Sequence, residues 1–306
     1  MDAAPHIHRP ILALGIRIGA IAALSTMAAL IKLVNARGVH LAEILFWRQA
    51  VFLPIGIAWA FIIARSLKPL ATKRPADHVR RALYGMLGMV LNFGGVILLP
   101  LAEATTMGFT APIFAVILAA IVLRDRVGMW RWSAVVLGFV GILLIAQPGS
   151  GHIPLVGALV ALGGAFMIAL ISIQIADLNK TETPLSIVFY FSLVSTPLYA
   201  LALPFVSTGH DAETWWLLLL IGLVGSVGQL LLTAALRFGK VASVVVMDYS
   251  SLFWATLYGW FLFDRLPPAS TWLGIPLIVG AGLLITWREH VLSRRRFADQ
   301  RQASGT

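Results

Sequence analysis

The sequence predicts an all-α polytopic membrane protein with ten transmembrane helices arranged as two inverted five-helix repeats. Three observations predict this fold: the apolar composition, the length of the apolar runs and the placement of basic residues between them. Of the 306 residues, 59% are hydrophobic and 12% are charged, whereas a soluble domain is about 25% charged. The length alone would suggest about two soluble domains, but a composition this apolar excludes them.

Ten apolar segments have a length suited to crossing a bilayer, which takes about 20 residues of helix. Lipid offers the backbone no hydrogen-bond partner, so a spanning segment is a helix or a barrel strand, and runs this continuous favour helices. The first segment is longer than the apolar part of a signal peptide, so we expect it to remain uncleaved. The expected helices are Ile11–Val34, Leu41–Ile63, Ala82–Leu99, Ala102–Leu123, Trp130–Ala146, Ile153–Ile175, Pro184–Val206, Thr214–Leu236, Val241–Phe263 and Ser270–Trp287.

The basic residues alternate with the segments. If the N terminus is cytoplasmic, the outer loops hold only Arg37 and Arg265 of the 23 Lys and Arg residues, while Arg17, Lys32 and Arg48 lie within segments. All others fall in inner loops or tails, as the positive-inside rule requires. The pattern predicts an inner (plasma) membrane protein with both termini in the cytoplasm. It also explains the net charge of +10, so we expect no nucleic-acid partner.

The two halves of the chain echo each other. The fourth segment ends in "AAIVLRDRV" (Ala119–Val127) and the ninth in "GWFLFDRLP" (Gly259–Pro267), so that Asp125 aligns with Asp264. An odd number of helices separates the two, which gives the halves opposite orientations in the membrane. Inverted repeats are typical of secondary transporters, with the substrate near the midplane between the repeats. The expected divisions are residues 1–147, residues 148–290 and a basic cytoplasmic tail, residues 291–306.

Longer stretches resemble one family over nearly the whole chain. They are "EILFWRQAVF", which contains Arg48, "LPLAEATTMGFTAPIFAVILAAIVLRDRV" in the fourth segment and "ASVVVMDYSSLFWATLYGWFLFDRLP" in the ninth. Each half also closes with a glycine-containing helix that ends in "GILLI" or "GLLIT". The chain thereby resembles the drug/metabolite transporter superfamily, and within it the EamA-like family.

The resemblance implies a transporter of small metabolites built from two inverted five-helix repeats. The family usually has glutamate where this chain has Asp125 and Asp264, so the charge at each turn is kept and its reach is shortened. The resemblance does not indicate which solute is moved, or in which direction.

Asp248 is a carboxylate in the apolar run "VVVMDYSSLFW". A charge at membrane depth is costly and usually marks a site or a structural pair. We expect Asp248 about two turns from the inner end of its helix, at the depth of Gln229 and Arg17, with Asn92 nearer the midplane. Asp248 therefore either lines a cavity, binding a cationic group or a proton, or is held by Arg17 or by backbone groups.

Aromatic residues follow Asp248 at helical spacing. Tyr249 and Phe253 share one face of the expected helix, and Trp254 and Tyr258 share another. Tyr249 and Trp254 are candidates for the walls of a pocket for a planar or amphipathic solute. The alternative is that these rings pack against neighbouring helices or lie in the interfacial belt.

Four further charges lie within or beside segments, towards the predicted outer face. Arg48 offers a fixed fork of donors that suits a carboxylate or phosphate, so it either meets an anionic substrate group or braces Glu103. Lys32 and Glu43 are at matching heights, so they form either an outer gate or a salt bridge at the rim, which would contribute little stability.

Pro112 lies within the fourth segment, where it removes a backbone hydrogen bond and frees a carbonyl. Its position predicts a kinked or broken fourth helix beside the cavity.

Several functions are disfavoured by what the sequence lacks. There is no cysteine, and no histidine has metal-ligand spacing on an apolar helix, so we expect no metal and no cofactor. No phosphate-binding loop is present. A membrane-embedded enzyme would need acid, base or metal-binding residues that converge at one depth, and the sequence shows no such group. A non-transporting scaffold would need long tails to bind a partner, and those of this chain are too short.

The sequence therefore predicts a secondary active transporter that moves a small organic metabolite by alternating access. The expected activity is efflux of an amino-acid-like or related metabolite. The alternative is uptake or exchange of a larger solute, such as a nucleoside-like or vitamin-like compound. The expected partners are the solute and the lipid bilayer, with protons as a candidate coupling ion and a homodimer as a candidate assembly.

Overall fold

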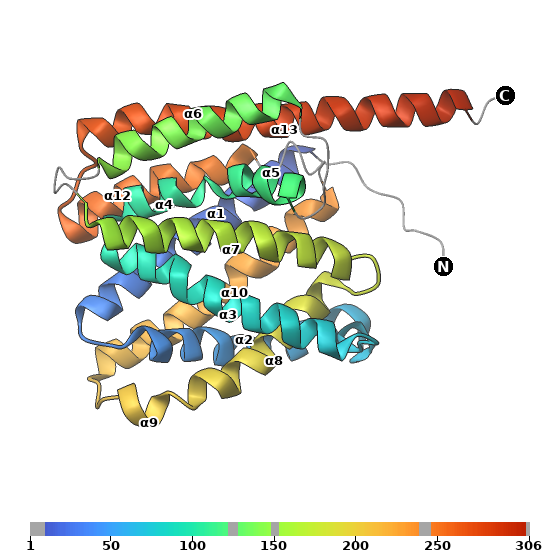
Figure 1. The fold of residues 1–306 in the computed structure, drawn as a ribbon. Coiled ribbons are helices and arrows are strands. Elements are labelled where there is room, and N and C mark those ends of the chain that lie inside the picture. The colour runs from blue at the N-terminus through green and yellow to red at the C-terminus, as the bar shows by residue number, and fades with distance from the viewer. Residues whose placement is uncertain (1–9, 122–127, 148–152, 239–245, 304–306) are drawn as a thin grey trace.

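The computed structural model describes residues 10–121, 128–147, 153–238 and 246–303. Over these ranges every regular element is a helix (Figure 1). The elements are α1 (Pro10–Ala36), α2 (Leu41–Ala64), η1 (Lys68–Leu70), α3 (Pro75–Leu98), α4 (Leu101–Gly108), α5 (Ala111–Ile121), α6 (Met129–Ala146), α7 (Leu155–Leu178), α8 (Pro184–Ala200), α9 (Leu203–Val206), α10 (Ala212–Phe238), η2 (Val246–Ser250), α12 (Ser251–Phe263) and α13 (Ala269–Ala303).

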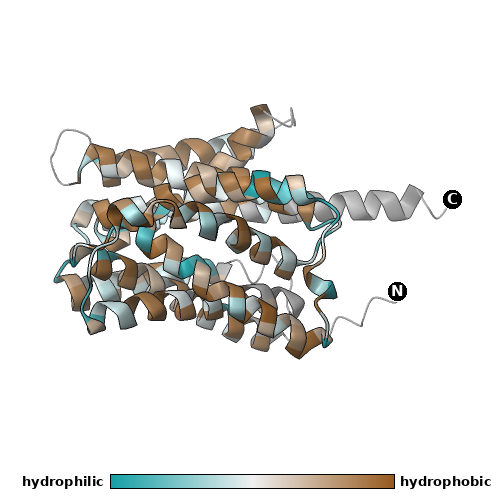
Figure 2. Ribbon diagram, turned by 90° about the horizontal axis from the view of Figure 1, so that it is seen from below, coloured by the Kyte–Doolittle hydropathy of each residue, from teal (hydrophilic) through white to brown (hydrophobic). Residues whose placement is uncertain are grey.

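Six stretches of helix among the described residues are long and apolar enough to cross a membrane: Leu14–Ala36, Leu41–Ala64, Pro75–Leu98, Leu101–Leu118, Leu155–Ile175 and Ala212–Leu232. Three more apolar helices are shorter: Trp132–Ala146, Pro184–Ala200 and Ala269–Ile285. Hydrophobic residues predominate along the helices (Figure 2), and large side chains such as Ile62, Phe205 and Trp216 are exposed. Exposed apolar surface of this extent suits lipid. The prediction of an all-α polytopic membrane protein is confirmed.

The expected fourth segment is interrupted. The helix α4 ends at Gly108 and α5 begins at Ala111, so the segment expected over Ala102–Leu123, with a kink or break at Pro112, is two helices. Pro112 is the second residue of α5, where its fixed φ suits a helix and its missing N–H costs nothing. The Met107 carbonyl at the end of α4 accepts from both the Thr110 hydroxyl, at 2.6 Å, and the Thr110 N–H, at 3.1 Å.

The described part of the ninth segment is also irregular. It begins with η2, a 3-10 turn that contains Asp248, and continues as α12. The helix α12 ends at Phe263, and Asp264 directly after it has a left-handed φ of 50°. The Arg265 N–H then bonds to the Gly259 carbonyl at 2.9 Å, a bond that closes a helix end. The matching turn at Asp125 lies outside the described residues.

The last helix is longer than expected. We expected it to end at Trp287, but α13 continues through Ala303, and it projects beyond the other helices (Figure 1).

The helices pair in a regular way. The most extensive contacts join α1 with α10, α3 with α7 and α6 with α13, followed by α2 with α8 and with α10. Glycines make the α3–α7 contact possible. A Cβ at Gly164 would lie 2.8 Å from the Asn92 Cα, and one at Gly95 would lie 2.8 Å from the Ala161 Cβ. Small residues at these positions let the two backbones approach closely.

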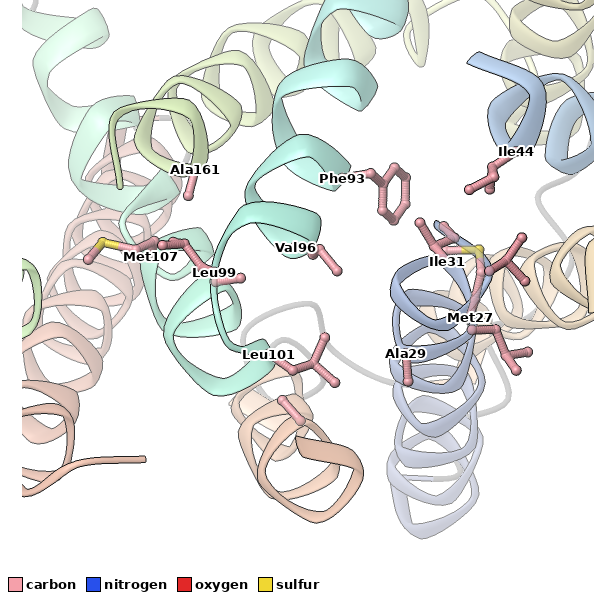
Figure 3. Close-up of a cluster of buried hydrophobic side chains, with 14 of the residues drawn as sticks. Met27, Ala29, Ile31, Ile44, Phe93, Val96, Leu99, Leu101, Met107 and Ala161 are labelled. Atoms are coloured by element: carbon pink, nitrogen blue, oxygen red, sulfur yellow. The ribbon is translucent and has the colours of Figure 1, made fainter. Parts of the chain in front are cut away.

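We call the end of the bundle at which α1 begins the terminal end, and the other the opposite end. The larger hydrophobic core lies towards the opposite end. Its members come from the last turns of α1 and α3 and from the first turns of α2, α4, α7 and α10. They include Val34, Leu45 and Leu218. Figure 3 shows further members, among them Ile31, Ile44, Phe93, Val96, Leu99, Leu101 and Ala161. Among the described residues, more of the buried apolar side chains are therefore clustered towards the opposite end than towards the terminal end.

Candidate functional site

Asp248 and Arg17 form a two-bond ion pair. Arg17 Nε donates to Oδ1 of Asp248 and Nη2 donates to Oδ2, each at 2.6 Å. The Arg17 side chain is 8% exposed and that of Asp248 is 33% exposed. The pair joins α1 to η2 in the half of the bundle nearer the terminal end. The planar fork of an arginine matches both carboxylate oxygens, which fixes orientation as well as charge.

The surrounding backbone holds both partners in place. Arg17 Nη1 donates to the Leu232 carbonyl of α10 at 3.4 Å, and the Ser251 hydroxyl donates to the Asp248 carbonyl at 2.7 Å. The ion pair therefore ties together α1, α10 and η2. Gln229, a predicted site residue, is half-buried one turn before Leu232 on α10. The structure thus realises the sequence alternative in which Asp248 is held by Arg17.

Tyr249 packs at the break in the fourth segment. Its ring lies 4.9 Å from that of Phe109, the residue between α4 and α5, at an angle of 67°. A Cβ at Gly282 of α13 would collide with the Tyr249 hydroxyl, so the glycine makes room for this ring. The two irregular elements therefore meet through an aromatic contact.

Trp254 belongs to a second aromatic group. It stacks on Tyr258 at 6.3 Å with an angle of 27°. The Tyr258 hydroxyl hydrogen-bonds the Thr26 hydroxyl of α1 at 2.7 Å. This arrangement corresponds to the packing alternative for the aromatic residues.

A cavity of about 440 Å³ lies beside these rings. It is lined by Tyr249, Leu252, Phe253, Thr256, Leu257, Trp260, Leu266 and Trp272. Phe253, Trp260 and Trp272 are each more than half exposed, so the cavity opens on the side of the bundle rather than beside the ion pair.

Arg48 lies between α1, α2 and α3. Its Nη1 donates to Gln49 Oε1 at 2.8 Å, Nε contacts Met27 Sδ at 3.3 Å, and the guanidinium lies 5.7 Å from the centre of the Phe93 ring. Among the described residues no carboxylate contacts it, so the structure does not form the alternative in which Arg48 braces Glu103, whose Oε1 accepts from Thr271. Asn92, half-buried on α3, lies where α3 crosses α7 at Gly164.

Lys32 caps the end of α3. Its Nζ donates to the carbonyls of Val96, Ile97 and Leu99 at 2.8, 3.1 and 2.6 Å. The last carbonyls of a helix have no partner within the helix, so one ammonium satisfies three of them. The alternative of a Lys32–Glu43 salt bridge is therefore not formed, because Lys32 binds carbonyls and Glu43 contacts His210.

Two buried carboxylates lie near the same end. Glu43 Oε1 contacts His210 Nε2 at 3.0 Å and accepts from the Ser207 hydroxyl at 3.1 Å. Glu103 Oε1 accepts from the Thr271 hydroxyl at 3.1 Å, which ties α4 to α13. These contacts join the helix ends that surround the larger core, so the opposite end is fastened by polar bonds as well as by packing.

Exposed charges fasten the terminal end. Arg74 pairs with Asp77 and Asp177, each at 2.7 Å, and so joins the start of α3 to the end of α7. Hydrogen bonds from Arg74 and Lys180 hold the pKa of Asp177 below its ordinary value. Such exposed pairs contribute little stability individually.

Sequence reasoning missed several buried polar residues near the start of α3. His78 and Arg81 are 1% and 9% exposed. His78 Nε2 lies 3.7 Å from Glu182, and the Arg81 guanidinium lies 4.1 Å above the Phe191 ring. We expected the third helix to begin at Ala82, which left these residues in a loop. Pro75 was the available signal, because proline favours the first turn of a helix.

Within the ranges that the structure describes, no group of His, Asp and Glu residues could hold a metal ion. The polar groups are instead arranged as single ion pairs and short hydrogen-bond chains between helices.

A model of the EamA-like transporter family matches the chain twice, over residues 11–147 and again over residues 155–287. The chain belongs to the EamA-like transporter family. It is therefore a multi-pass membrane transporter of a small molecule, and not an enzyme.

Similar proteins include a riboflavin transporter of Rhizobium johnstonii, 32% identical over 79% of this chain and 81% of the relative. A riboflavin transporter of Vibrio cholerae is 30% identical over 74% of this chain and 76% of the relative. A pseudopaline exporter of Pseudomonas aeruginosa is 30% identical over 86% of this chain and 91% of the relative. One solved crystal structure matches 94% of this chain and 99% of its own, with a TM-score of 0.63 and 21% identity, and so shares the fold.

Proposed function

We propose that this EamA-like transporter is a secondary active transporter that moves a small organic metabolite by alternating access. Its ten transmembrane segments form two inverted five-helix repeats. The protein lies in the inner (plasma) membrane, with both termini in the cytoplasm.

The pattern of helix pairs is the observation that supports the repeat most directly. In an inverted repeat, segments 1, 8 and 9 correspond to segments 6, 3 and 4. The contact of α1 with α10 then corresponds to that of α7 with α3. The contact of α1 with α12 corresponds likewise to that of α7 with α4 and α5. The pairs α2–α8, α4–α12 and α6–α13 each join a segment to its own counterpart. The double match of the family model supports the same division.

The uneven packing supports alternating access. The opposite end is closed by the larger core and by the contacts of Lys32, Glu43 and Glu103. Towards the terminal end, the Arg17–Asp248 pair ties α1, α10 and η2 by specific bonds. A transporter moves its solute by releasing one such closure while forming the other. We assign the ion pair as the element that solute or proton binding releases.

The solute we favour is an amino-acid-like metabolite, which the protein exports. Arg48 lacks a carboxylate partner in the described part of the chain, and a zwitterion offers both an anion for such a group and a cation for Asp248. Asn92, Gln229, Tyr249 and Trp254 complete the proposed path.

A second candidate is uptake of a vitamin-like solute. Its support is that two relatives at 30% and 32% identity are named riboflavin transporters. The half-buried rings of Tyr249 and Trp254 suit a planar solute of that kind.

The test is transport in proteoliposomes loaded with a mixture of amino acids, nucleosides and vitamins that includes riboflavin. Mass spectrometry of the external medium reports which compounds leave, and the reverse gradient tests uptake. We expect flux of an amino-acid-like compound above that of empty liposomes. Flux of riboflavin alone would establish the second candidate, and no flux in either direction would refute transport of the tested classes.

A further inference from the structure

Two arginines share one polar region between α2, α3 and α8. Arg48 enters it from α2 and contacts Met89 of α3, and Arg81 enters it from α3 and lies against Gly85, one turn before Met89. Like charges at membrane depth are costly unless a counter-charge accompanies them. The arrangement therefore requires a compensating group.

Arg81 is turned along α3 towards Arg48. A Cβ at Gly85 would lie 2.8 Å from Arg81 Nη1 and 2.7 Å from the Phe191 ring, so the guanidinium lies over this glycine. Gly85 is one turn beyond Arg81 and one turn before Met89, whose sulfur contacts Arg48. Residues four apart lie on the same helix face, so Arg81 extends along α3 in the direction of Arg48.

Arg48 is oriented by a short chain of hydrogen bonds to α8. Its Nη1 donates to Gln49 Oε1, and Gln49 Nε2 donates to the Ser195 hydroxyl at 2.9 Å. The Ser195 hydroxyl donates in turn to the carbonyl of Phe191, the residue whose ring lies beneath Arg81. This series of hydrogen bonds thus connects the surroundings of Arg48 and Arg81 through α8.

Several donors in this region have no acceptor. Arg81 Nε and Nη1 are buried without a hydrogen bond, and so are the hydroxyls of Ser192 and Thr196 on α8. Arg81 is 9% exposed and Ser192 is 1% exposed. Buried polar groups normally have partners, so these atoms indicate a ligand that accepts hydrogen bonds.

None of the described carboxylates contacts either arginine. The neighbouring charged or titratable side chains are His78, which lies close to Arg81, and Tyr199, which lies close to Arg48. Glu182 is engaged by His78 and by the Thr72 hydroxyl. The rings of Phe93 and Phe191 offset part of the cationic charge, but a ring is not an acceptor for the free N–H groups.

We propose that Arg48 and Arg81 form an anion subsite that binds a carboxylate or phosphate group of the transported solute. The proposal rests on the proposed transport function and narrows its solutes to those with an anionic group. The guanidinium forks supply the bonds, and Ser192 and Thr196, which follow Phe191 and Ser195 on α8, carry further unpaired hydroxyls.

The test measures anion binding without transport. The purified protein in nanodiscs of zwitterionic lipid is titrated with succinate or inorganic phosphate, replacing chloride at constant ionic strength, and thermal unfolding is followed. We expect both anions to raise the unfolding temperature. Arg48→Gln and Arg81→Gln should each weaken the apparent affinity about tenfold, as expected for a lost charge-assisted bond.

Two further variants make the result specific. Arg80→Gln is the matched control, because Arg80 is exposed and pairs with Asp77; it should bind like the wild type. Gly85→Ala should weaken binding without removing a charge, because its methyl group displaces the Arg81 guanidinium. If Arg81→Gln fails to fold, Gly85→Ala still tests whether the position of the Arg81 guanidinium affects anion binding.

The proposal is overturned if neither anion stabilises the wild type, or if Arg48→Gln and Arg81→Gln are stabilised equally well. Stabilisation by phosphatidylglycerol in the nanodisc, with none by the soluble anions, also overturns it, because the occupant would then be a lipid headgroup. The proteoliposome assay distinguishes the two proposals. Solute flux without anion binding refutes only the subsite, and anion binding without flux refutes only transport.

Discussion

Asp248 is held by Arg17 through two bonds of 2.6 Å, and the pair is the only two-bond ion pair between helices in the described ranges. Arg17 is almost fully buried, whereas a third of the Asp248 side chain is exposed. The carboxylate is therefore the accessible partner, which a proton or a cationic group of the solute can reach. Releasing it would free α1 from η2.

We predict that Asp248→Asn destabilises the protein and slows transport. The substitution leaves the Arg17 charge without a counter-charge, and loss of such a buried bond costs about 1–3 kcal/mol of unfolding free energy. Adding Arg17→Gln should recover part of that loss, because the two residues act as a unit. Thermal unfolding and proteoliposome flux measure the two effects. Additive costs in the double variant would refute the coupling, and unchanged flux would refute the proposed role of Asp248.

The packing of neighbouring helices depends on glycines at their closest contacts. The Cβ that Gly164 lacks would meet the backbone of Asn92, which cannot move aside as a flexible side chain can. By contrast, Gly15 on α1 has nothing within 4 Å of its Cβ position. The two glycines are therefore a matched pair, in which packing alone differs.

We predict that Gly164→Ala lowers the free energy of unfolding by about 1–3 kcal/mol, the usual cost of overpacking. Gly15→Ala should be neutral or stabilising by up to about 1 kcal/mol, because alanine is the better helix former. Chemical or thermal unfolding in detergent compares them. Equal effects of the two substitutions would contradict the close α3–α7 contact.

The elements also show how far the sequence could predict this structure. Apolar length and Pro112 indicated most helices and the site of the α4–α5 break. Helix starts within polar sequence were harder, so Arg81 was placed in a loop. The partners of Lys32 and Arg48 were not predicted because they depend on how each helix is rotated against its neighbours. Hydropathy does not determine that rotation. Arg17 was found as a candidate partner of Asp248 because both share one depth.

Alternating access by the whole bundle requires the opposite end to open and close. Ala104 of α4 is 8% exposed and belongs to the larger core at that end. The chain contains no cysteine, so Ala104→Cys gives a single reactive thiol. Its labelling rate by a maleimide in nanodiscs reports how often the opposite end opens.

Lys32→Met provides the perturbation, because it removes the ammonium that caps three carbonyls at the end of α3. Lys180→Met is the control, since the Lys180 side chain is 72% exposed at the terminal end. Lys32→Met should raise the labelling rate several-fold, and Lys180→Met should not.

The most direct test is the labelling rate of Ala104→Cys with and without the solute that the flux assay identifies. Alternating access predicts slow labelling without solute, and a rate that changes in a saturable way as solute binds and shifts the two conformations. A rate that stays the same at every solute concentration, in a variant that still transports, would contradict it.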